Sequence, residues 1–274
     1  MLEILHDLFS YTFIVRALIV GTLVSLCAAP LGVSLVLKRY SMIGDGLSHV
    51  GFGALAVAMA FHWAPLPVAI PVVVVAAFLL LRLSENSKIK GDSAIALIAS
   101  SSLAIGVTVI SLASGQNADV YSYMFGSILA MKESDVYVSI ALSVVVLILF
   151  IVFYNKIFAV TFDENFAKAT GTRANLYNML IALLTAVTIV VGMRIMGTML
   201  ISSLIIFPAL SAMRIFRQFR SVVIASAVIS IICFFIGLVA SYAFSTPTGA
   251  SIVIVNLIVF LLCFAAGLIR KKAA

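Results

Sequence analysis

The segment VYVSIALSVVVLILFIVFY, residues 136–154, carries no charged side chain and is apolar on every face of a helix. Its length is close to the roughly 20 apolar residues that cross a bilayer. Similar runs occupy residues 12–37, 46–61, 67–83, 93–113, 176–193, 198–213, 221–244 and 250–269. The runs 46–61 and 198–213 are short, and Pro208 interrupts the second one. The sequence therefore predicts an all-α, polytopic transmembrane bundle of eight or nine spans.

The composition excludes a soluble fold. Of the 274 residues, 64% are hydrophobic and 10% are charged, whereas soluble domains carry roughly 25% charged residues. No polar stretch is long enough for a soluble catalytic or nucleotide-binding domain, so we expect residues 1–274 to form a single transmembrane domain. We attribute the net charge of +7 to membrane topology and expect no nucleic-acid partner.

Lysine and arginine are distributed unevenly between the predicted loops. If the basic residues 270–272 are cytoplasmic and nine spans alternate, all Lys and Arg residues except Arg16, Lys132 and Arg194 lie on the cytoplasmic side. The positive-inside rule then predicts a cytoplasmic C-terminus and an N-terminus on the outer side. The apolar segment 121–131 is too short to cross, and we expect it to form a half-helix near the outer face.

The longest polar loop contains the sequence FDENFAKATG, which is typical of a short helix. Asp163 and Glu164 are favourable near a helix N-terminus, and Gly171 is a common type of C-terminal cap. Phe166 and Ala167 would be available for a partner. From these residues alone, a docking helix under the membrane and a simple connector are equally acceptable interpretations.

One acid, Asp45, falls inside a predicted span rather than at a loop or a span end. It precedes His49 by four residues, so both side chains project from one helix face. A carboxylate and an imidazole form half of a metal site, and a twofold-related second copy would complete a four-ligand N/O site suited to Zn²⁺ and tolerable for Mn²⁺. The alternative is that Asp45 caps a helix starting at Gly46, while His49 bonds a neighbouring helix. We expect His6 and His62 to be surface residues.

Enzyme and ion-driven transporter interpretations find little support. The chain contains no H-E-x-x-H, G-x-S-x-G or G-x-x-x-x-G-K-[ST] motif. One embedded aspartate and one embedded histidine offer few groups for a catalytic site. A proton- or sodium-driven transporter would usually need several embedded carboxylates, and only Asp45 is available.

Five stretches together resemble a known family, the membrane permease subunits of ATP-binding-cassette (ABC) importers for zinc, manganese and iron. The stretches are LKRYSMIGDGLSHVGFGALA (37–56), YSYMFGSILA (121–130), FDENFAKATG (162–171), GTMLISSLIIFPALSA (197–212) and PTGASIVI (247–254). The similarity extends over nearly the whole chain. The segment 51–56 departs from the proline-containing form that many members have and looks more like the zinc-importing members.

The resemblance implies a metal permease in a bacterial cell membrane, with a fold like that of the vitamin B12 and siderophore importers. It implies that Asp45 and His49 are metal ligands in the pathway, and that residues 162–171 form the coupling helix. In that helix, Asp163, Glu164, Phe166, Ala167 and Gly171 would seat in the ATPase.

The resemblance also implies a set of partners. These are a second permease copy, two ATPase subunits and an extracytoplasmic metal-binding lipoprotein or periplasmic protein. We expect the outer protein to dock on residues 62–66, 116–119 and 245–248. No permanently bound cofactor is expected. The transported ion is expected to be Zn²⁺, with Mn²⁺ or Fe²⁺ as alternatives.

Overall fold

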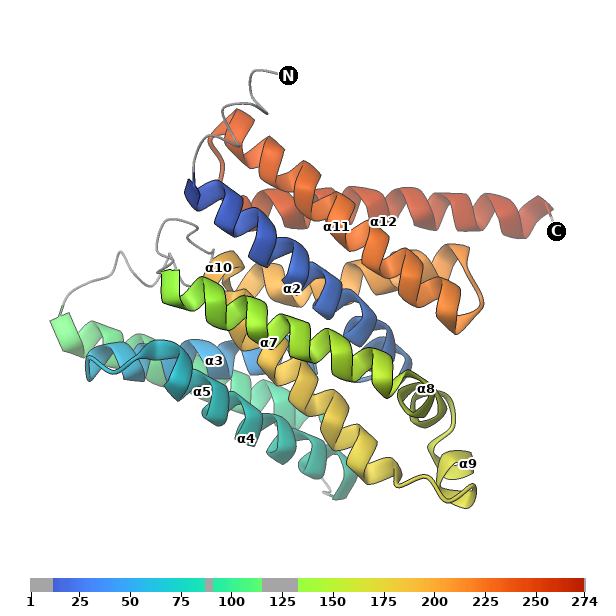
Figure 1. The fold of residues 1–274 in the computed structure, drawn as a ribbon, viewed down its shortest axis with the longest axis horizontal. Coiled ribbons are helices and arrows are strands. Elements are labelled where there is room, and N and C mark those ends of the chain that lie inside the picture. The colour runs from blue at the N-terminus through green and yellow to red at the C-terminus, as the bar shows by residue number, and fades with distance from the viewer. Residues whose placement is uncertain (1–11, 87–90, 115–132, 274) are drawn as a thin grey trace.

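Every regular element that the structure describes is an α-helix (Figure 1). The computed structural model describes residues 12–86, 91–114 and 133–273. The helices are α2 (Thr12–Leu37), α3 (Ile43–Ala60), α4 (Pro65–Asn86), α5 (Gly91–Ser114), α7 (Glu133–Val152), α8 (Tyr154–Phe162), α9 (Glu164–Ala169), α10 (Ala174–Ile215), α11 (Phe219–Phe244) and α12 (Thr248–Ala273). Within these residues, nine helical spans are apolar and long enough to cross a membrane. The predicted all-α bundle is confirmed.

The two runs that are short in the sequence both form candidate spans. α3 begins at Ile43, ahead of the predicted start, and provides a span of 18 residues. The second run forms the span Met196–Ile215, and Pro208 lies inside it without ending the helix. Neighbouring helices in a membrane bundle commonly compensate the hydrogen bond that a proline removes.

α10 contains two spans because its chain reverses at Gly197. This residue has φ 82° and ψ 165°, a conformation that is essentially restricted to glycine. The spans Ala174–Met193 and Met196–Ile215 lie on either side of it. Both ends of α10 therefore lie at the same end of the molecule, near α9 and the start of α11 (Figure 1).

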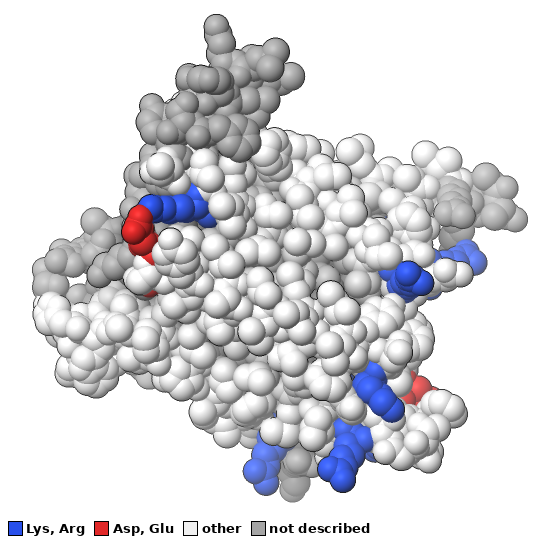
Figure 2. All heavy atoms as spheres, viewed as in Figure 1, with Lys and Arg blue, Asp and Glu red and all other residues white. Residues whose placement is uncertain are grey.

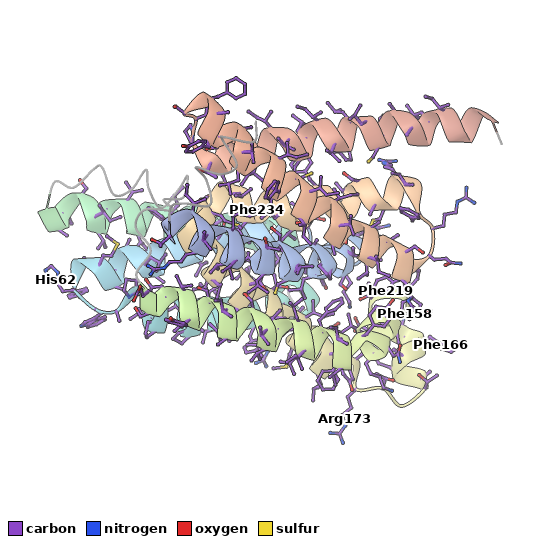
Figure 3. The ribbon with its side chains drawn as sticks, turned by 45° about the horizontal axis from the view of Figure 1, so that its top comes forward. His62, Phe158, Phe166, Arg173, Phe219 and Phe234 are labelled. Atoms are coloured by element: carbon purple, nitrogen blue, oxygen red, sulfur yellow. The ribbon has the colours of Figure 1, made fainter. Side chains whose placement is uncertain are left out.

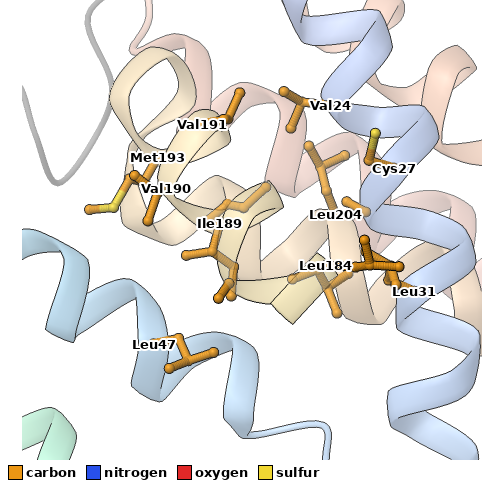
Figure 4. Close-up of a cluster of buried hydrophobic side chains, with 14 of the residues drawn as sticks. Val24, Cys27, Leu31, Leu47, Leu184, Ile189, Val190, Val191, Met193 and Leu204 are labelled. Atoms are coloured by element: carbon orange, nitrogen blue, oxygen red, sulfur yellow. The ribbon is translucent and has the colours of Figure 1, made fainter. Parts of the chain in front are cut away.

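The core forms around α10, which contacts α2, α3, α4, α7, α8, α9, α11 and α12. Side chains of α2, α3 and both halves of α10 pack together there (Figure 4). α2 approaches α10 closely at Gly32, because glycine has no Cβ. A Cβ at this position would lie 1.8 Å from the Ile205 carbonyl oxygen. Apolar lipid offers no hydrophobic gain over apolar protein, so such close packing is what holds membrane helices together.

Charged side chains gather at one end of the molecule (Figure 2). Exposed basic residues there belong to α8, α9 and the α10–α11 junction, and they include Lys156, Lys168 and Arg217. At the other end, Arg16 on α2 pairs with Glu133 at the start of α7. Arg16 is one of the three basic residues outside the predicted cytoplasmic set, and it forms an ion pair with a carboxylate.

Candidate functional site

Asp45 and His49 lie on one face of α3, as their spacing predicts. The His49 Nε2 and Asp45 Oδ2 atoms are 3.7 Å apart. The side chains are 22% exposed for His49 and 42% exposed for Asp45. Tetrahedral ligands at about 2.1 Å from a zinc ion lie about 3.4 Å apart, so a small movement would let one cation contact both atoms.

The capping interpretation of Asp45 is wrong. α3 begins at Ile43, so Asp45 lies within the first turn, and the residue at the N-cap position is Met42, whose side chain forms no cap hydrogen bond. The helix starts earlier than predicted, since the Gly46 N–H already bonds the Met42 carbonyl oxygen at 3.0 Å. A carboxylate in the first turn is still favoured by the helix dipole. The Asp45 side chain is therefore left available for other partners.

The structure adds Ser202 to this site, a residue that the sequence did not single out. The Ser202 hydroxyl donates to Asp45 Oδ1 across 3.3 Å, and it also lies 3.2 Å from the Thr198 carbonyl oxygen on its own helix. The reversal at Gly197 places this turn of α10 beside α3. Serines in apolar runs are common in membrane helices, and Ser202 has a second serine beside it, so no sequence signal distinguished it.

His49 keeps one nitrogen unsatisfied. Its Nδ1 atom is buried and has no hydrogen-bond partner, so the expected bond from His49 to a neighbouring helix is absent from the described part of the chain. No group of three or more His, Cys, Asp or Glu side chains is close enough to hold a metal among the residues described. One copy of the chain thus offers an Asp–His pair, which fits half of an N/O site and not a closed metal trap.

The helix predicted within residues 162–171 is present as α9. The Asp163 side chain accepts a hydrogen bond from the Phe166 backbone N–H at 2.9 Å, as an N-cap residue does. Gly171 has φ 80° and follows the helix end, and its N–H bonds the Lys168 carbonyl oxygen at 3.0 Å. Both predicted ends of the helix are confirmed.

Phe166 and Ala167 differ in what they can contact. Phe166 is 65% exposed, and Figure 3 shows it at the end of the molecule opposite His62. Ala167 is buried against Val160 and Ala174, so the expectation that it is available for a partner is wrong. At six residues α9 is short, and Ala167 is its one buried side chain.

α8 contacts α9 through Val160 and the start of α11 through Phe158. Phe158 of α8 packs against Phe219 at the start of α11, with ring centroids 5.0 Å apart (Figure 3). Tilted aromatic pairs of this kind contribute beyond their buried area.

Glu164 forms a polar cluster that the sequence did not predict. Its Oε2 atom accepts from Lys38 Nζ at 3.2 Å and from Asn178 Nδ2 at 3.0 Å, while Lys168 Nζ lies 2.8 Å from Oε1. Lys38 Nζ also donates to Asn178 Oδ1 at 2.7 Å. Partial burial raises the pKa of the Glu164 carboxyl. The hydrogen bonds from Lys168, Asn178 and Lys38 have a larger, opposite effect and lower the pKa to about 2.

Two of the three segments expected to receive an outer protein can be placed. Residues 62–66 join α3 to α4 and residues 245–248 join α11 to α12, and both turns lie at the end opposite α8 and α9 (Figures 1 and 3). His62 is exposed, as predicted. Residues 116–119 and the half-helix predicted at 121–131 lie outside the described residues.

Known proteins match this chain over almost its whole length. Residues 10–267 match the ABC 3 transport family. The chain belongs to this family. It is 29% identical over 249 residues to the manganese import system permease protein ScaB of Streptococcus gordonii, covering 91% of this chain and 89% of that protein. It is 30% identical over 236 residues to the high-affinity zinc uptake system membrane protein ZnuB of Haemophilus influenzae, covering 86% and 90%.

Solved structures agree with the fold. A chain of PsaBC from Streptococcus pneumoniae in complex with Fab superimposes with a TM-score of 0.86 at 29% identity, covering 96% of this chain and 94% of that one. A metal-chelate type ABC transporter in an inward-facing conformation gives a TM-score of 0.72 over 92% of this chain and 86% of that one, and at 15% identity it supports the fold alone.

Membership of the ABC 3 family decides between the classes of protein that the sequence left open. The chain is a multi-pass membrane protein, the metal-ion permease subunit of an ABC importer, and not an enzyme. The ion-driven transporter is no longer an alternative, because ABC transport draws its energy from separate ATPase components.

Proposed function

We propose that this ABC 3 permease carries a divalent transition-metal ion, zinc in the first instance, past Asp45 and His49. The observation that carries the proposal is the Asp–His pair itself, with ligand atoms 3.7 Å apart on a partly exposed face of α3. An incomplete ligand set suits a cation that must leave again. The Ser202 hydroxyl would orient the Asp45 carboxylate when the ion binds.

The identity of the metal is the finer part of the proposal. Carboxylate and imidazole ligands bind zinc, manganese and ferrous iron, so the ligand types do not choose among them. Relatives of similar identity are named for manganese and for zinc. We propose zinc because a tetrahedral N/O site needs only two ligands from each of two copies, and manganese is the alternative that the experiment must include.

The assembly follows from the same proposal. Residues 1–274 would act as one permease domain, two copies would face each other across the pathway, and the cytoplasmic end would be the end that carries α8, α9 and the C-terminus. Two ATPase subunits would bind there, with Phe166 as the exposed contact, Asp163 and Gly171 fixing the ends of α9, and Glu164 and Ala167 anchoring it. A metal-binding protein would dock at the opposite end.

The test is metal uptake by cells or proteoliposomes that contain the complete importer. Asp45→Asn removes the charge and keeps the shape, and His49→Ala removes the imidazole. Each is expected to lower uptake of radioactive zinc at limiting concentration by more than about 100-fold, because loss of a supporting residue around a metal site already costs about 10–100-fold.

Asp92→Asn is the matched control, since Asp92 is an exposed aspartate in the first turn of another spanning helix, α5. Its uptake should stay within about twofold of the wild type, the change expected of an exposed surface residue. Undiminished zinc uptake in Asp45→Asn would show that the ion does not use this pair. Saturable manganese uptake with competition by zinc only at large excess would reassign the cargo.

A further inference from the structure

Lys38, Glu164 and Asn178 form a polar cluster that extends beyond α9. Lys168 already pairs with Glu164 inside α9, and Asp163 already caps that helix. Lys38 and Asn178 come instead from two other elements, more than 100 and 14 residues away from Glu164 in sequence. The cluster therefore joins three parts of the chain.

Each partner of Glu164 is connected along the chain to an element that contributes to the Asp–His site. Lys38 follows the last residue of α2, and the short turn after it opens directly into α3, whose first turn carries Asp45. Asn178 lies in the first span of α10, and the second span of the same helix carries Ser202, which bonds Asp45. Glu164 is thus hydrogen-bonded to the turn that precedes α3 and to the first span of α10.

Two of the three members of the cluster are shielded from water, and Glu164 is partly exposed. The Lys38 side chain is 9% exposed and Asn178 is buried. All three members of the cluster bond one another, with lengths of 3.2 Å, 2.7 Å and 3.0 Å. Exposed ion pairs between flexible side chains move independently, whereas a closed triangle of partly buried bonds restrains the relative position of its elements.

The turn that follows Lys38 is itself constrained. Arg39 has φ 61°, a left-handed conformation that few residues with a Cβ adopt. The Arg39 N–H bonds the Val36 carbonyl oxygen at 3.1 Å, and the Tyr40 N–H bonds the Leu35 carbonyl oxygen at 2.8 Å, so the end of α2 is closed by a Schellman motif. A displacement of Lys38 would pass through this tight turn to α3 instead of being absorbed by a loose loop.

We propose that the Lys38–Glu164–Asn178 triangle is the mechanical joint through which movement of α9 is transmitted to the helices that hold Asp45. The inference rests on the proposed function, in which α9 receives the ATPase and Asp45 holds the ion. Lys38 and Asn178 are positioning residues, since neither reaches the Asp–His pair. Breaking the triangle should separate ATP hydrolysis from metal transport without removing either component.

The test compares Lys38→Met with Lys38→Arg in the purified complete importer, with its ATPase subunits and outer binding protein, in proteoliposomes. Metal ions imported per ATP hydrolysed are measured. Lys38→Met should assemble and hydrolyse ATP, but the ratio should fall by at least about fivefold, the lower end of coupling between linked sites. Lys38→Arg keeps the donor and the charge and should restore the ratio to within about twofold.

Two further lysines provide comparisons. Lys156→Met removes an exposed lysine at the same end of the molecule and should leave the ratio unchanged. Lys168→Met removes the ion pair with Glu164 inside α9 and leaves the three bonds of the triangle in place, so its effect should be smaller than that of Lys38→Met. If Lys168→Met lowered the ratio as much as Lys38→Met does, the charge around Glu164 would matter and the triangle would not.

Asn178→Ala decides the matter if Lys38→Met fails to assemble, because it keeps the Lys38–Glu164 ion pair and breaks only the bonds to α10. An unchanged ratio of ions to ATP in the assembled variant overturns the joint. Failure of the wild-type importer to carry zinc or manganese would instead overturn the proposed function. The two failures are distinguishable, since the second is seen without any substitution.

Discussion

Asp45 and Glu164 are two carboxylates in similar positions with different surroundings. Each lies in the first turn of a helix, α3 and α9, and their side chains are similarly exposed, at 42% and 32%. Glu164 accepts hydrogen bonds from two lysines and one amide. Asp45 receives one long hydrogen bond from a serine and lies 3.7 Å from an imidazole.

The comparison shows that the number of partners, more than burial, separates the roles of the two acids. A carboxylate whose lone pairs are occupied by ammonium and amide donors is committed to holding elements together. A carboxylate with vacant lone pairs beside an imidazole offers ligands to a cation. Glu164 therefore fits a structural role, and Asp45 fits the metal-binding role that we propose for it.

The largest expected difference between the two acids is in stability. Glu164→Ala should lower the free energy of unfolding by about 3 kcal/mol, because it leaves the nearly buried Lys38 ammonium without its carboxylate. Asp45→Ala should change it by less than about 0.5 kcal/mol, as exposed weak contacts do. Denaturant titration of the purified permease in detergent micelles measures both. Similar losses in the two variants would contradict the structural role of Glu164.

A pH titration sharpens the comparison further. The pKa of Glu164 falls from 4.5 to about 2 on folding, so folding favours its charged form. The stabilisation is fully present above pH 4.5 and is lost as the pH falls toward 2. Its size is about 2 kcal/mol once the shift is discounted for partial exposure.

Thermal unfolding of the purified permease between pH 6 and pH 3 should show this loss in the wild type. Glu164→Gln has no carboxyl group at this position, so it should be less stable at pH 6 and should lose less on acidification. Parallel curves for the two proteins would mean that Glu164 does not carry the acid sensitivity.

Much of the fold could be predicted from the sequence, because each membrane span is a continuous apolar segment that can be recognised without its tertiary contacts. Length and uniform apolarity were enough to locate all nine candidate spans within a few residues. The ends of α9 were also local, since Asp163 and Gly171 act on their own turns. The start of α3 was missed by three residues because Ile43 and Gly44 give no capping signal, and the N-cap residue, Met42, makes no side-chain bond.

The candidate site was only half accessible to the sequence. Asp45 and His49 could be paired because their spacing alone puts them on one face. Ser202, Lys38 and Asn178 could not be assigned, because their partners lie far along the chain and depend on the reversal at Gly197 and the packing of α2 on α10. Ala167 was misassigned for the same reason, since only tertiary packing covers it.

The smallest effect concerns the one hydrogen bond that Asp45 does receive. Ser202→Ala should raise the metal concentration needed for half-maximal uptake by about tenfold, the lower end of the range for residues that orient a metal ligand, because the bond is long at 3.3 Å. Ser203→Ala is the matched control, since the adjacent hydroxyl is buried without a hydrogen-bond partner among the described residues and should alter uptake by less than about twofold. If the maximal rate fell and the half-maximal concentration stayed constant, Ser202 would act on the movement of α10 instead of on the carboxylate. Asp45 would then hold the ion without help from the second half of α10. The contrast with Glu164, whose carboxylate is fixed by three donors, would be larger still.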